Sequence, residues 1–385
     1  MKVAFVSNYY NHHQAPCSEA LFKLLNGEYT FISTEKMDDE RAAMGWGNIF
    51  EPSFVIHYDE EPLLCDKIID EYDIVIIGSA PYSLIKNRVK KGKITFLYTE
   101  RLFKKKVDIL RLLKYKFLYH RWFGRYKNFY LLCASAFTYA DFLKVLSFKN
   151  KGYKWGYFPK TFLFDDLENK IDEKEQESVS LLFVSRLIPL KHPELPIFIT
   201  KRLKDEGIKV KLTIIGNGTL KNDVLDLIAK NQLDEDVSII ESLKPEQVRE
   251  HMIKSNILLF TSDRNEGWGA VMNEAMNSGC AIVASSAIGS VPFLLNSGEN
   301  GFIYKDGDFE DLYKKTKLLC VDKQLRQTIG KNAYKNITEV WSAENAAKRF
   351  LVLCDDIMKF GESNGFKNGP CSKAKAIKDN WFDNK

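Results

Sequence analysis

The sequence predicts an α/β protein built from two doubly wound parallel sheets. Short apolar runs alternate with helical patterns along most of the chain, and this alternation is typical of parallel strands covered by helices on both faces. At 385 residues the chain exceeds the size at which a single core keeps growing, so two domains are expected. An acidic, polar stretch at 161–178 divides the two series of strands and is typical of an interdomain linker.

The first half, residues 1–160, is expected to form a Rossmann-like domain. A helix near residues 18–25 follows its first strand, and a long basic helix precedes its last strand. The apolar runs that predict its strands are 2–7, 73–79, 93–100 and 129–136.

The second half repeats this pattern in residues 179–345. Its helices are expected to begin near Pro193, Leu220, Pro245 and Ala270. The apolar runs that predict its strands are 181–187, 211–216, 237–240, 256–262 and 280–285. Ligands of open α/β sheets bind beyond the carboxyl ends of the strands, so we expect a cleft between the domains with the binding residues in those loops.

The composition argues against export, a disulfide framework and a membrane span. The seven cysteines are scattered and never form a C-x2-C pair, so neither disulfides nor a zinc site is expected. The N-terminal apolar run alternates like a strand without a cleavage site after it, and no segment reaches the ~20 apolar residues of a membrane helix. We therefore expect a cytoplasmic protein.

Two glutamates stand eight positions apart in 263-DRNEGWGAVMNEAMNSGCAIVAS-285. Glu266 is expected in the loop that leaves a strand, and Glu274 inside the helix that follows. Between them lie main-chain amides suited to hydroxyls and anionic oxygens, those of Gly267, Trp268, Gly269 and Ala270. The spacing alone is most often that of two solvated glutamates, but the Gly-rich turn and the small residues that follow the helix favour a binding role.

This stretch resembles the E-x7-E motif of retaining GT-B glycosyltransferases of family 4, the glycosyl transferases group 1. The resemblance implies that Glu266 binds hydroxyls of a donor sugar and Glu274 binds the ribose of a nucleotide-sugar. It also implies the GT-B fold, with two Rossmann-like domains facing across a cleft and a C-terminal helix in the tail, 346–385, that packs back on the N-terminal domain. No cofactor and no metal are implied, because the nucleotide-sugar is a substrate.

Two cations, Arg186 and Lys191, stand in 181-LLFVSRLIPLKHPELPIF-198 between an expected strand and the next helix. Such a pair by itself is most often a surface feature. Here it resembles the family's GRL-x3-KG motif, whose cations hold the donor diphosphate, although Ser185 and His192 replace the glycines. Fixed cations stabilise the charge that develops on a leaving phosphate, so we assign both residues a catalytic role that needs no metal.

Three further segments resemble the family in the same order along the chain. They are 213–224, with a Gly-x-Gly loop, 237–252, whose loop contacts the base in relatives, and 287–304. The resemblance places donor contacts at Gly216, Asn217, Ser242 and Leu243. The triplet Asp306-Gly307-Asp308 is similar to a metal-binding DxD sequence, but its setting predicts a turn followed by a helix N-cap.

The first domain carries two less specific candidates. The loop 7-SNYYNHHQAPC-17 holds a histidine pair where many relatives have glycines near the donor phosphates, and His13 is taken as the donor contact. Glu100 ends a strand where relatives often carry a histidine, which implies an acceptor-side base. An ordinary loop for His13, and a surface ion pair of Glu100 with Arg101 or a lysine, are the alternatives.

Basic charge is concentrated in 86–127, where fifteen Lys and Arg residues face only Glu100 and Asp108. Apolar and aromatic residues recur among them at roughly helical spacing, which suits an anionic membrane surface. A core-facing helix with a solvated face is the alternative. Nucleic acid would use the same charge, but no nucleic-acid module is found. We expect peripheral contact with the inner face of the cell membrane.

These features predict a metal-independent hexosyl- or related glycosyltransferase, and the resemblance to the family implies that it retains the configuration of the sugar. The expected donor is a nucleotide-sugar, with a UDP-sugar favoured over a GDP-sugar, and the expected acceptor is a hydroxyl of a lipid-linked sugar or polysaccharide. The resemblance implies a role in bacterial capsule, O-antigen or exopolysaccharide synthesis. The alternatives are a GT-B sugar-nucleotide epimerase or hydrolase, and a catalytically silent subunit that binds a membrane or a partner enzyme.

Overall fold

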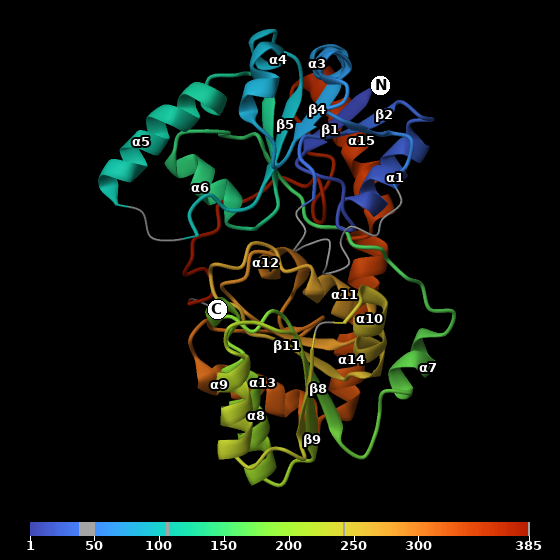
Figure 1. The fold of residues 1–385 in the computed structure, drawn as a ribbon, viewed down its shortest axis with the longest axis vertical. Coiled ribbons are helices and arrows are strands. Elements are labelled where there is room, and N and C mark those ends of the chain that lie inside the picture. Colours follow the sequence, from blue (N-terminus) through green and yellow to red (C-terminus); the bar gives the residue numbers. More distant parts are fainter. Residues whose placement is uncertain (38–50, 105–107, 242, 384–385) are drawn as a thin grey trace. The chain divides into compact units, whose positions relative to one another are not determined.

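The structure is a computed structural model that describes residues 1–383 apart from 38–50, 105–107 and 242. The chain divides into two compact units (Figure 1). The first unit consists of Met1–Lys160 and Val340–Asp379, and the second of Thr161–Glu339 and Asn380–Lys385. The predicted linker, 161–178, therefore belongs to the second unit, where Ile171 is buried.

The first unit contains a seven-stranded parallel sheet in the order β3-β2-β1-β4-β5-β6-β7. Three of its strands, β1, β4 and β6, are buried along their whole length, as expected when helices cover both faces of a sheet. In register, Val3 of β1 lies between Tyr29 and Ile74. The strands are β1 (Val3–Ser7), β2 (Tyr29–Ser33), β3 (Val55–His57), β4 (Ile74–Ile77), β5 (Thr95–Thr99), β6 (Phe129–Cys133) and β7 (Gly152–Lys154).

The helices of the first unit include the C-terminal helix α15, which packs along α1 as predicted. Phe350 of α15 contributes to the core through an edge contact with Phe96 and a tilted ring contact with Trp155. The helical segments are α1 (Ala15–Leu24), α3 (Pro62–Glu71), η1 (Tyr82–Ile85), α4 (Lys86–Lys90), α5 (Ile109–Tyr119), η2 (His120–Gly124), α6 (Thr138–Lys144) and α15 (Ala343–Phe360).

The second unit contains a six-stranded parallel sheet in the order β10-β9-β8-β11-β12-β13. Its strands are β8 (Val179–Val184), β9 (Val210–Ile215), β10 (Val237–Ile240), β11 (Ile257–Phe260), β12 (Ala281–Ser285) and β13 (Phe302–Tyr304). The predicted fold class, two Rossmann-like α/β domains, is confirmed.

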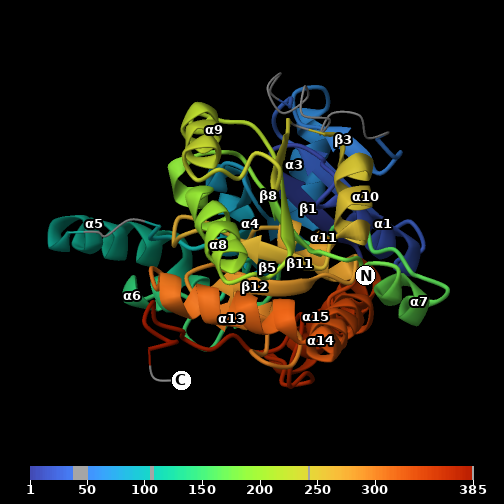
Figure 2. The ribbon, with the colours of Figure 1, turned by 90° about the horizontal axis from the view of Figure 1, so that it is seen from below.

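Helices cover both faces of this sheet, with α13 beside α8 and α14 beside α11 (Figure 2). The helical segments of the second unit are α7 (Leu167–Asp172), η3 (Pro189–Lys191), α8 (Glu194–Asp205), α9 (Lys221–Lys230), α10 (Pro245–Lys254), α11 (Val271–Asn277), α12 (Val291–Leu294), α13 (Phe309–Val321), α14 (Lys323–Lys335) and η4 (Asn336–Val340), which reaches the boundary with the first unit.

Four strands were not predicted from the sequence: β2, β3, β7 and β13. Three of them are three residues long and lie at sheet edges, so they are too short to show a hydrophobic period. The predicted long basic helix is also shorter than expected: α5 ends at Tyr119 and a π-helical turn, η2, follows it.

Arg88 is a fully buried cation at one end of the first sheet. Its guanidinium donates to the Thr95 hydroxyl at 3.1 Å and to four main-chain carbonyls, those of Ile69, Tyr72, Asp73 and Ile94, at 2.6–2.9 Å. One side chain thus ties the end of α3 to the starts of β4 and β5.

We expect Arg88→Met to lower the free energy of unfolding by about 3–5 kcal/mol, because it leaves several buried carbonyls without donors. Urea unfolding of the two proteins measures this difference. Lys90→Met on the exposed side of the same helix is the matched control, and its effect should stay within about 0.5 kcal/mol. Equal losses in the two variants would contradict the structural role of Arg88.

Candidate active site

Loops at the carboxyl edge of the second sheet bring together most of the predicted donor-binding residues. The loops that follow β8, β9 and β11 meet there because these strands are neighbours in a parallel sheet. The loop after β8 carries Arg186 and Lys191, and the loop after β11 carries Glu266.

The Gly-x-Gly loop after β9 holds the Arg186 loop in place. A Cβ on Gly216, whose φ is +151°, would lie 1.9 Å from the carbonyl oxygen of Ser185, so only glycine permits this approach. The Leu187 amide donates to the carbonyl of Asn217 at 2.9 Å. Gly216 and Asn217 are therefore positioned to support the cation. The Arg186 side chain is exposed and, in the part of the chain that the structure describes, forms no ion pair.

Lys191 and Glu266 form an ion pair that the sequence did not predict. The Lys191 ammonium contacts one carboxylate oxygen of Glu266, and the Ser262 hydroxyl donates to the same oxygen at 3.0 Å. Only 12–13% of either side chain is exposed. The Thr261 hydroxyl donates to the Lys191 carbonyl at 2.8 Å, which fixes the two loops to each other. A desolvated pair of this kind presents a cation and a carboxylate at one point of the sheet edge.

The indole of the Gly-Trp-Gly step lies in the protein interior. Trp268 is fully buried, its Nε1 donates to Asn273 Oδ1 at 2.9 Å, and its carbonyl accepts from the Ser290 hydroxyl at 2.6 Å. The indole is therefore enclosed by the protein, and the predicted donor contact of Trp268 stays a prediction for its main-chain amide.

Gly269 and Ala270 connect this step to the helix. Gly269 has φ +79°, and a Cβ on it would lie 2.2 Å from the Phe260 ring. Ala270 is the N-cap of α11, which begins at Val271. The buried Gly267 precedes them, so the main chain at 267–270 is fixed by packing on β11.

Glu274 lies in the first turn of α11. Burial raises its pKa to about 7, and the nearby positive charge of Arg249 counteracts part of that rise. Arg249 belongs to α10; its guanidinium lies 3.5 Å from the centre of the Phe162 ring and donates to Asn277 Oδ1 at 3.2 Å. The sequence did not indicate Arg249, because it is one of several charged residues on α10 and only packing selects it.

The remaining predicted residues of this unit are Ser242 and Leu243 and the aspartates of the Asp306-Gly307-Asp308 triplet. Ser242 lies outside the described residues, whereas Leu243 is half-buried just before α10. Asp308 accepts from the Asp311 amide as the N-cap of α13, which confirms the predicted cap. Asp306 accepts from the Ser285 hydroxyl at 3.0 Å. Among the described residues, no group of three or more His, Cys, Asp or Glu side chains is arranged to hold a metal ion.

In the first unit, Glu100 follows β5 and is held by two donors. The Tyr157 hydroxyl donates to its Oε1 at 2.7 Å and the Lys104 ammonium to its Oε2 at 2.8 Å. A carboxylate has about four lone-pair sites, so positions remain for a hydroxyl of a ligand. A carboxylate paired with a cation and a phenol is better suited to orient such a hydroxyl than to remove its proton.

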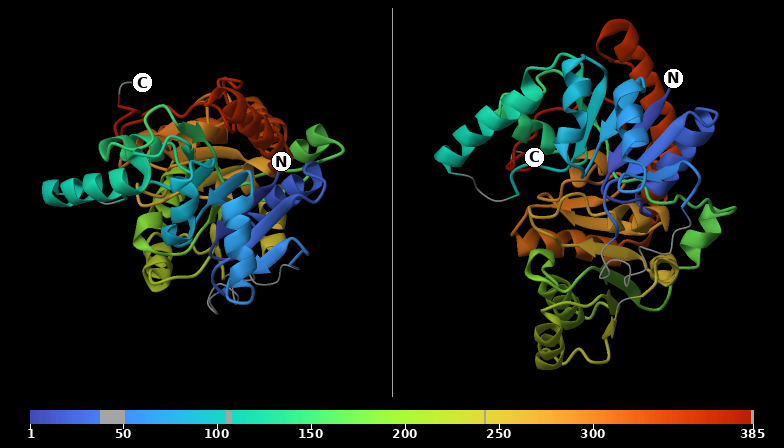
Figure 3. Two further views of the ribbon diagram at one scale, coloured as in Figure 1. Left: turned by 90° about the horizontal axis from the view of Figure 1, so that it is seen from above. Right: turned by 45° about the horizontal axis from the view of Figure 1, so that its top comes forward.

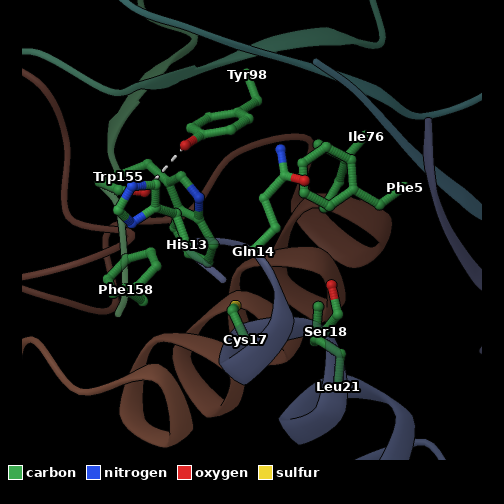
Figure 4. A pocket seen from close by; sticks show the side chains of 11 residues that line it. Phe5, His13, Gln14, Cys17, Ser18, Leu21, Ile76, Tyr98, Trp155 and Phe158 are labelled. Atoms are coloured by element: carbon green, nitrogen blue, oxygen red, sulfur yellow. Dashed lines mark hydrogen bonds between the residues drawn. The ribbon is translucent and has the colours of Figure 1, made fainter. Parts of the chain in front are cut away.

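His13 lies in the same region and lines a small pocket with Gln14, Tyr98, Trp155 and Phe158 (Figure 4). Its ring stacks on that of Tyr157, with centroids 5.6 Å apart and planes inclined by 17°. Burial lowers the pKa of His13 well below its ordinary value and that of the neighbouring His12 to about 4. Both rings are therefore neutral at pH 7, which makes His13 a hydrogen-bonding group rather than a phosphate-binding cation.

Comparison with known proteins shows what this chain is similar to in sequence and in fold. Residues 165–336 match the model of the family described as Glycosyl transferases group 1. The capsular polysaccharide biosynthesis glycosyltransferase CapM of Staphylococcus aureus is 29% identical over 200 residues, covering 50% of this chain and 51% of that protein. The Campylobacter jejuni enzyme N-acetylgalactosamine-N,N'-diacetylbacillosaminyl-diphospho-undecaprenol 4-alpha-N-acetylgalactosaminyltransferase is 29% identical over 202 residues, covering 51% of each chain.

The matched region thus spans about half the length of these curated relatives. Two solved structures share the fold over most of the chain. HepE from Anabaena, solved in complex with UDP, has a TM-score of 0.67 at 16% identity and covers 92% of this chain and 100% of its own. TarM has a TM-score of 0.67 at 12% identity, covering 92% and 98%.

Proposed function

We propose that the chain, whose residues 165–336 match the Glycosyl transferases group 1 model, is a retaining, metal-independent glycosyltransferase that uses a nucleotide-sugar donor. The observation that carries the proposal is the arrangement of Arg186 with the Lys191–Glu266 pair at the carboxyl edge of neighbouring strands. A UDP-sugar is favoured as the donor, and the Anabaena neighbour was solved with UDP.

The proposed mechanism uses the charges on this edge. During transfer the bond between the anomeric carbon and the diphosphate oxygen breaks, the acceptor oxygen forms the new bond to the anomeric carbon, and the proton of the acceptor hydroxyl passes to the departing diphosphate. Negative charge grows on the departing diphosphate, where Arg186 and Lys191 stabilise it more strongly in the transition state than in the ground state. When Lys191 pairs with the diphosphate, it no longer pairs with Glu266, and the Glu266 carboxylate can accept hydrogen bonds from the donor sugar. Glu274 is proposed to bind the ribose through its carboxylate.

The acceptor is proposed to be a hydroxyl of a lipid-linked sugar or polysaccharide, as in bacterial capsule or other polysaccharide synthesis. By name, the Staphylococcus aureus relative acts in capsular polysaccharide biosynthesis and the Campylobacter jejuni relative on a sugar linked to diphospho-undecaprenol. Glu100, oriented by Tyr157 and Lys104, is the proposed group that binds the acceptor hydroxyl.

The test is a panel of UDP- and GDP-sugars, measured first for binding and then for transfer. We expect nucleoside diphosphate binding by calorimetry that Arg186→Ala weakens at least tenfold. Lys230→Ala, which removes an exposed cation at the end of α9, should bind normally. Absence of binding, or equal binding by Arg186→Ala, would refute the proposal. Turnover without an acceptor would instead identify a hydrolase or an epimerase.

The helix α5 supports a second part of the proposal, peripheral contact with an anionic membrane. None of its residues is buried, and it stands out from the rest of the first unit in both views of Figure 3. Ile109, Leu110, Leu113 and Phe117 share one face at helical spacing and are 55–80% exposed. Arg111, Lys114 and Lys116 add positive charge to the same helix.

This composition suits a helix that lies in the headgroup region, with its apolar face inserted and its cations on anionic lipids. It would place the protein on the inner face of the cell membrane. Residues 105–107 of the basic region lie outside the described residues. No helix in the described parts of the chain is long and apolar enough to cross a bilayer.

We expect the triple replacement Arg111→Gln, Lys114→Gln, Lys116→Gln to weaken binding to anionic vesicles roughly a hundredfold, since each cation contributes about 1 kcal/mol near the surface. The loss should shrink as salt rises, because salt screens the interaction in the parent protein. The control replaces three exposed lysines of the second unit, Lys209, Lys230 and Lys323, by glutamine. Unchanged sedimentation of the α5 variant would exclude this contact.

A further inference from the structure

His192 occupies a backbone position where a side chain is unfavourable. It follows η3 directly after Lys191, with φ 50° and ψ 55° in the left-handed region. Glycine adopts this conformation at no steric cost, and the family motif has glycine here, so the imidazole adds strain next to a proposed catalytic lysine. Strain of this kind at a binding loop points to a function for the side chain.

The imidazole lies between carboxylates on two different elements. Its Nδ1 is 2.9 Å from Glu194 Oε1 at the start of α8, and its Nε2 is 3.8 Å from Asp263 Oδ2 in the loop after β11. Asp306, in the loop after β13, adds a third negative charge nearby. Only the protonated ring carries a donor on both nitrogens, so the imidazolium alone can satisfy both contacts at once.

These contacts join the two loops that carry the proposed donor-binding pair. The Asp263 amide donates to the Leu190 carbonyl at 2.9 Å. The Thr261 hydroxyl also donates to the His192 carbonyl, at 3.3 Å. The loop of Lys191 is thus fastened to the loop of Glu266 by main-chain bonds on one side and by the His192 ring on the other.

We propose that His192, as an imidazolium bridging Glu194 and Asp263, is a positioning residue that holds Lys191 in its donor-binding place. This inference rests on the proposed function of the same site. It makes binding of a nucleoside diphosphate depend on pH through a residue that does not itself contact the ligand.

The sign of the dependence follows from the surroundings of the ring. The hydrogen bond with Glu194, followed by the charges of Glu194, Asp263 and Asp306, raises the pKa of His192 above its ordinary value of 6.5. The bridge is therefore complete at low pH and is lost as pH rises through the raised pKa. Affinity for UDP should fall in that range.

The experiment measures UDP affinity of the whole chain by calorimetry from pH 5.5 to 9, for the wild type, His192→Gln and His192→Gly. UDP loses a proton from its terminal phosphate in the same range, so the variants serve to subtract the ionisation of the ligand. We expect the wild type to lose roughly fivefold more affinity than either variant as pH rises. A structural role alone would shift the thermal midpoint of both variants but leave their pH profiles parallel to that of the wild type, and parallel profiles would overturn the inference.

A second measurement separates failure of the inference from failure of the proposed function. Titration of the imidazole by NMR in the free protein should give a His192 pKa above 6.5 that falls in Glu194→Gln. If UDP binds at no pH, the proposed function is wrong whatever His192 does. If UDP binds but His192 titrates at its ordinary pKa and Glu194→Gln leaves it there, the bridge is wrong.

Discussion

Lys191→Ala is expected to lower kcat by about 10²–10³-fold while changing the donor KM much less. The ammonium group contributes most where charge develops on the leaving diphosphate, and removing one such fixed group typically has an effect of this size. Steady-state kinetics with the donor found in the nucleotide-sugar panel measures both parameters. A rise in KM with kcat unchanged would show that Lys191 serves binding alone.

The ion pair adds a test that the single variant cannot supply. Because Lys191 and Glu266 contact each other, Lys191→Ala also leaves a partly buried carboxylate without its cation. We expect the double variant with Glu266→Gln to lose little more activity than the worse single variant, since groups that act as a unit are not additive. Multiplied losses would show that the two side chains act independently.

Glu274→Gln is expected to stabilise the protein at neutral and alkaline pH while weakening nucleotide binding. Burial raises the pKa of Glu274 from its ordinary 4.5 to about 7, so between these values the native state keeps a proton that the unfolded chain releases. The free energy of unfolding of the wild type therefore falls as pH rises through this window, by about 3 kcal/mol at most. Glutamine is neutral throughout and does not suffer this loss.

Urea unfolding without nucleotide at pH 4 and pH 8 measures the effect: the two proteins should be alike at pH 4 and the variant more stable at pH 8. Glu250→Gln, an exposed glutamate on α10, is the control and should follow the wild type at both pH values. UDP affinity of Glu274→Gln should fall about tenfold, because a carboxylate that accepts ribose hydroxyls becomes an amide. A wild-type stability that is independent of Glu274 at pH 8 would contradict the buried carboxylate.

A residue that lowers stability when ionised and is proposed to bind nucleotide, as Glu274 is, is typical of one retained for function. A carboxyl that opposes folding when ionised, yet stands at the edge of a binding sheet, is a recognised sign of a functional site. The same reasoning does not apply to Arg88, whose five hydrogen bonds all go to the fold itself.

Much of the site could be predicted from local sequence. Strands and helices alternate clearly enough to show that Arg186 and Glu266 follow strands and that Glu274 lies in a helix, and the structure has β8, β11 and α11 in those places. The burial of the Trp268 indole could not be predicted, because a fully buried indole and an exposed one have the same sequence surroundings. Arg249 and the Tyr157 contact of Glu100 had no local pattern, whereas the Glu100–Lys104 ion pair is the lysine contact that the sequence offered as the alternative.

The sequence by itself determined the fold class, the alternation of strands and helices, and the loops in which the charged residues lie, because these depend on hydrophobic period and turn residues that neighbouring positions share. Only the tertiary structure decided which of those loops meet. Lys191 and Glu266 are 75 positions apart and are in contact because β8 and β11 pair in the sheet. The tertiary structure also decided which residues are buried. Trp268 is enclosed, the pKa of Glu274 is raised and α5 is exposed, because each outcome depends on which distant segments pack there.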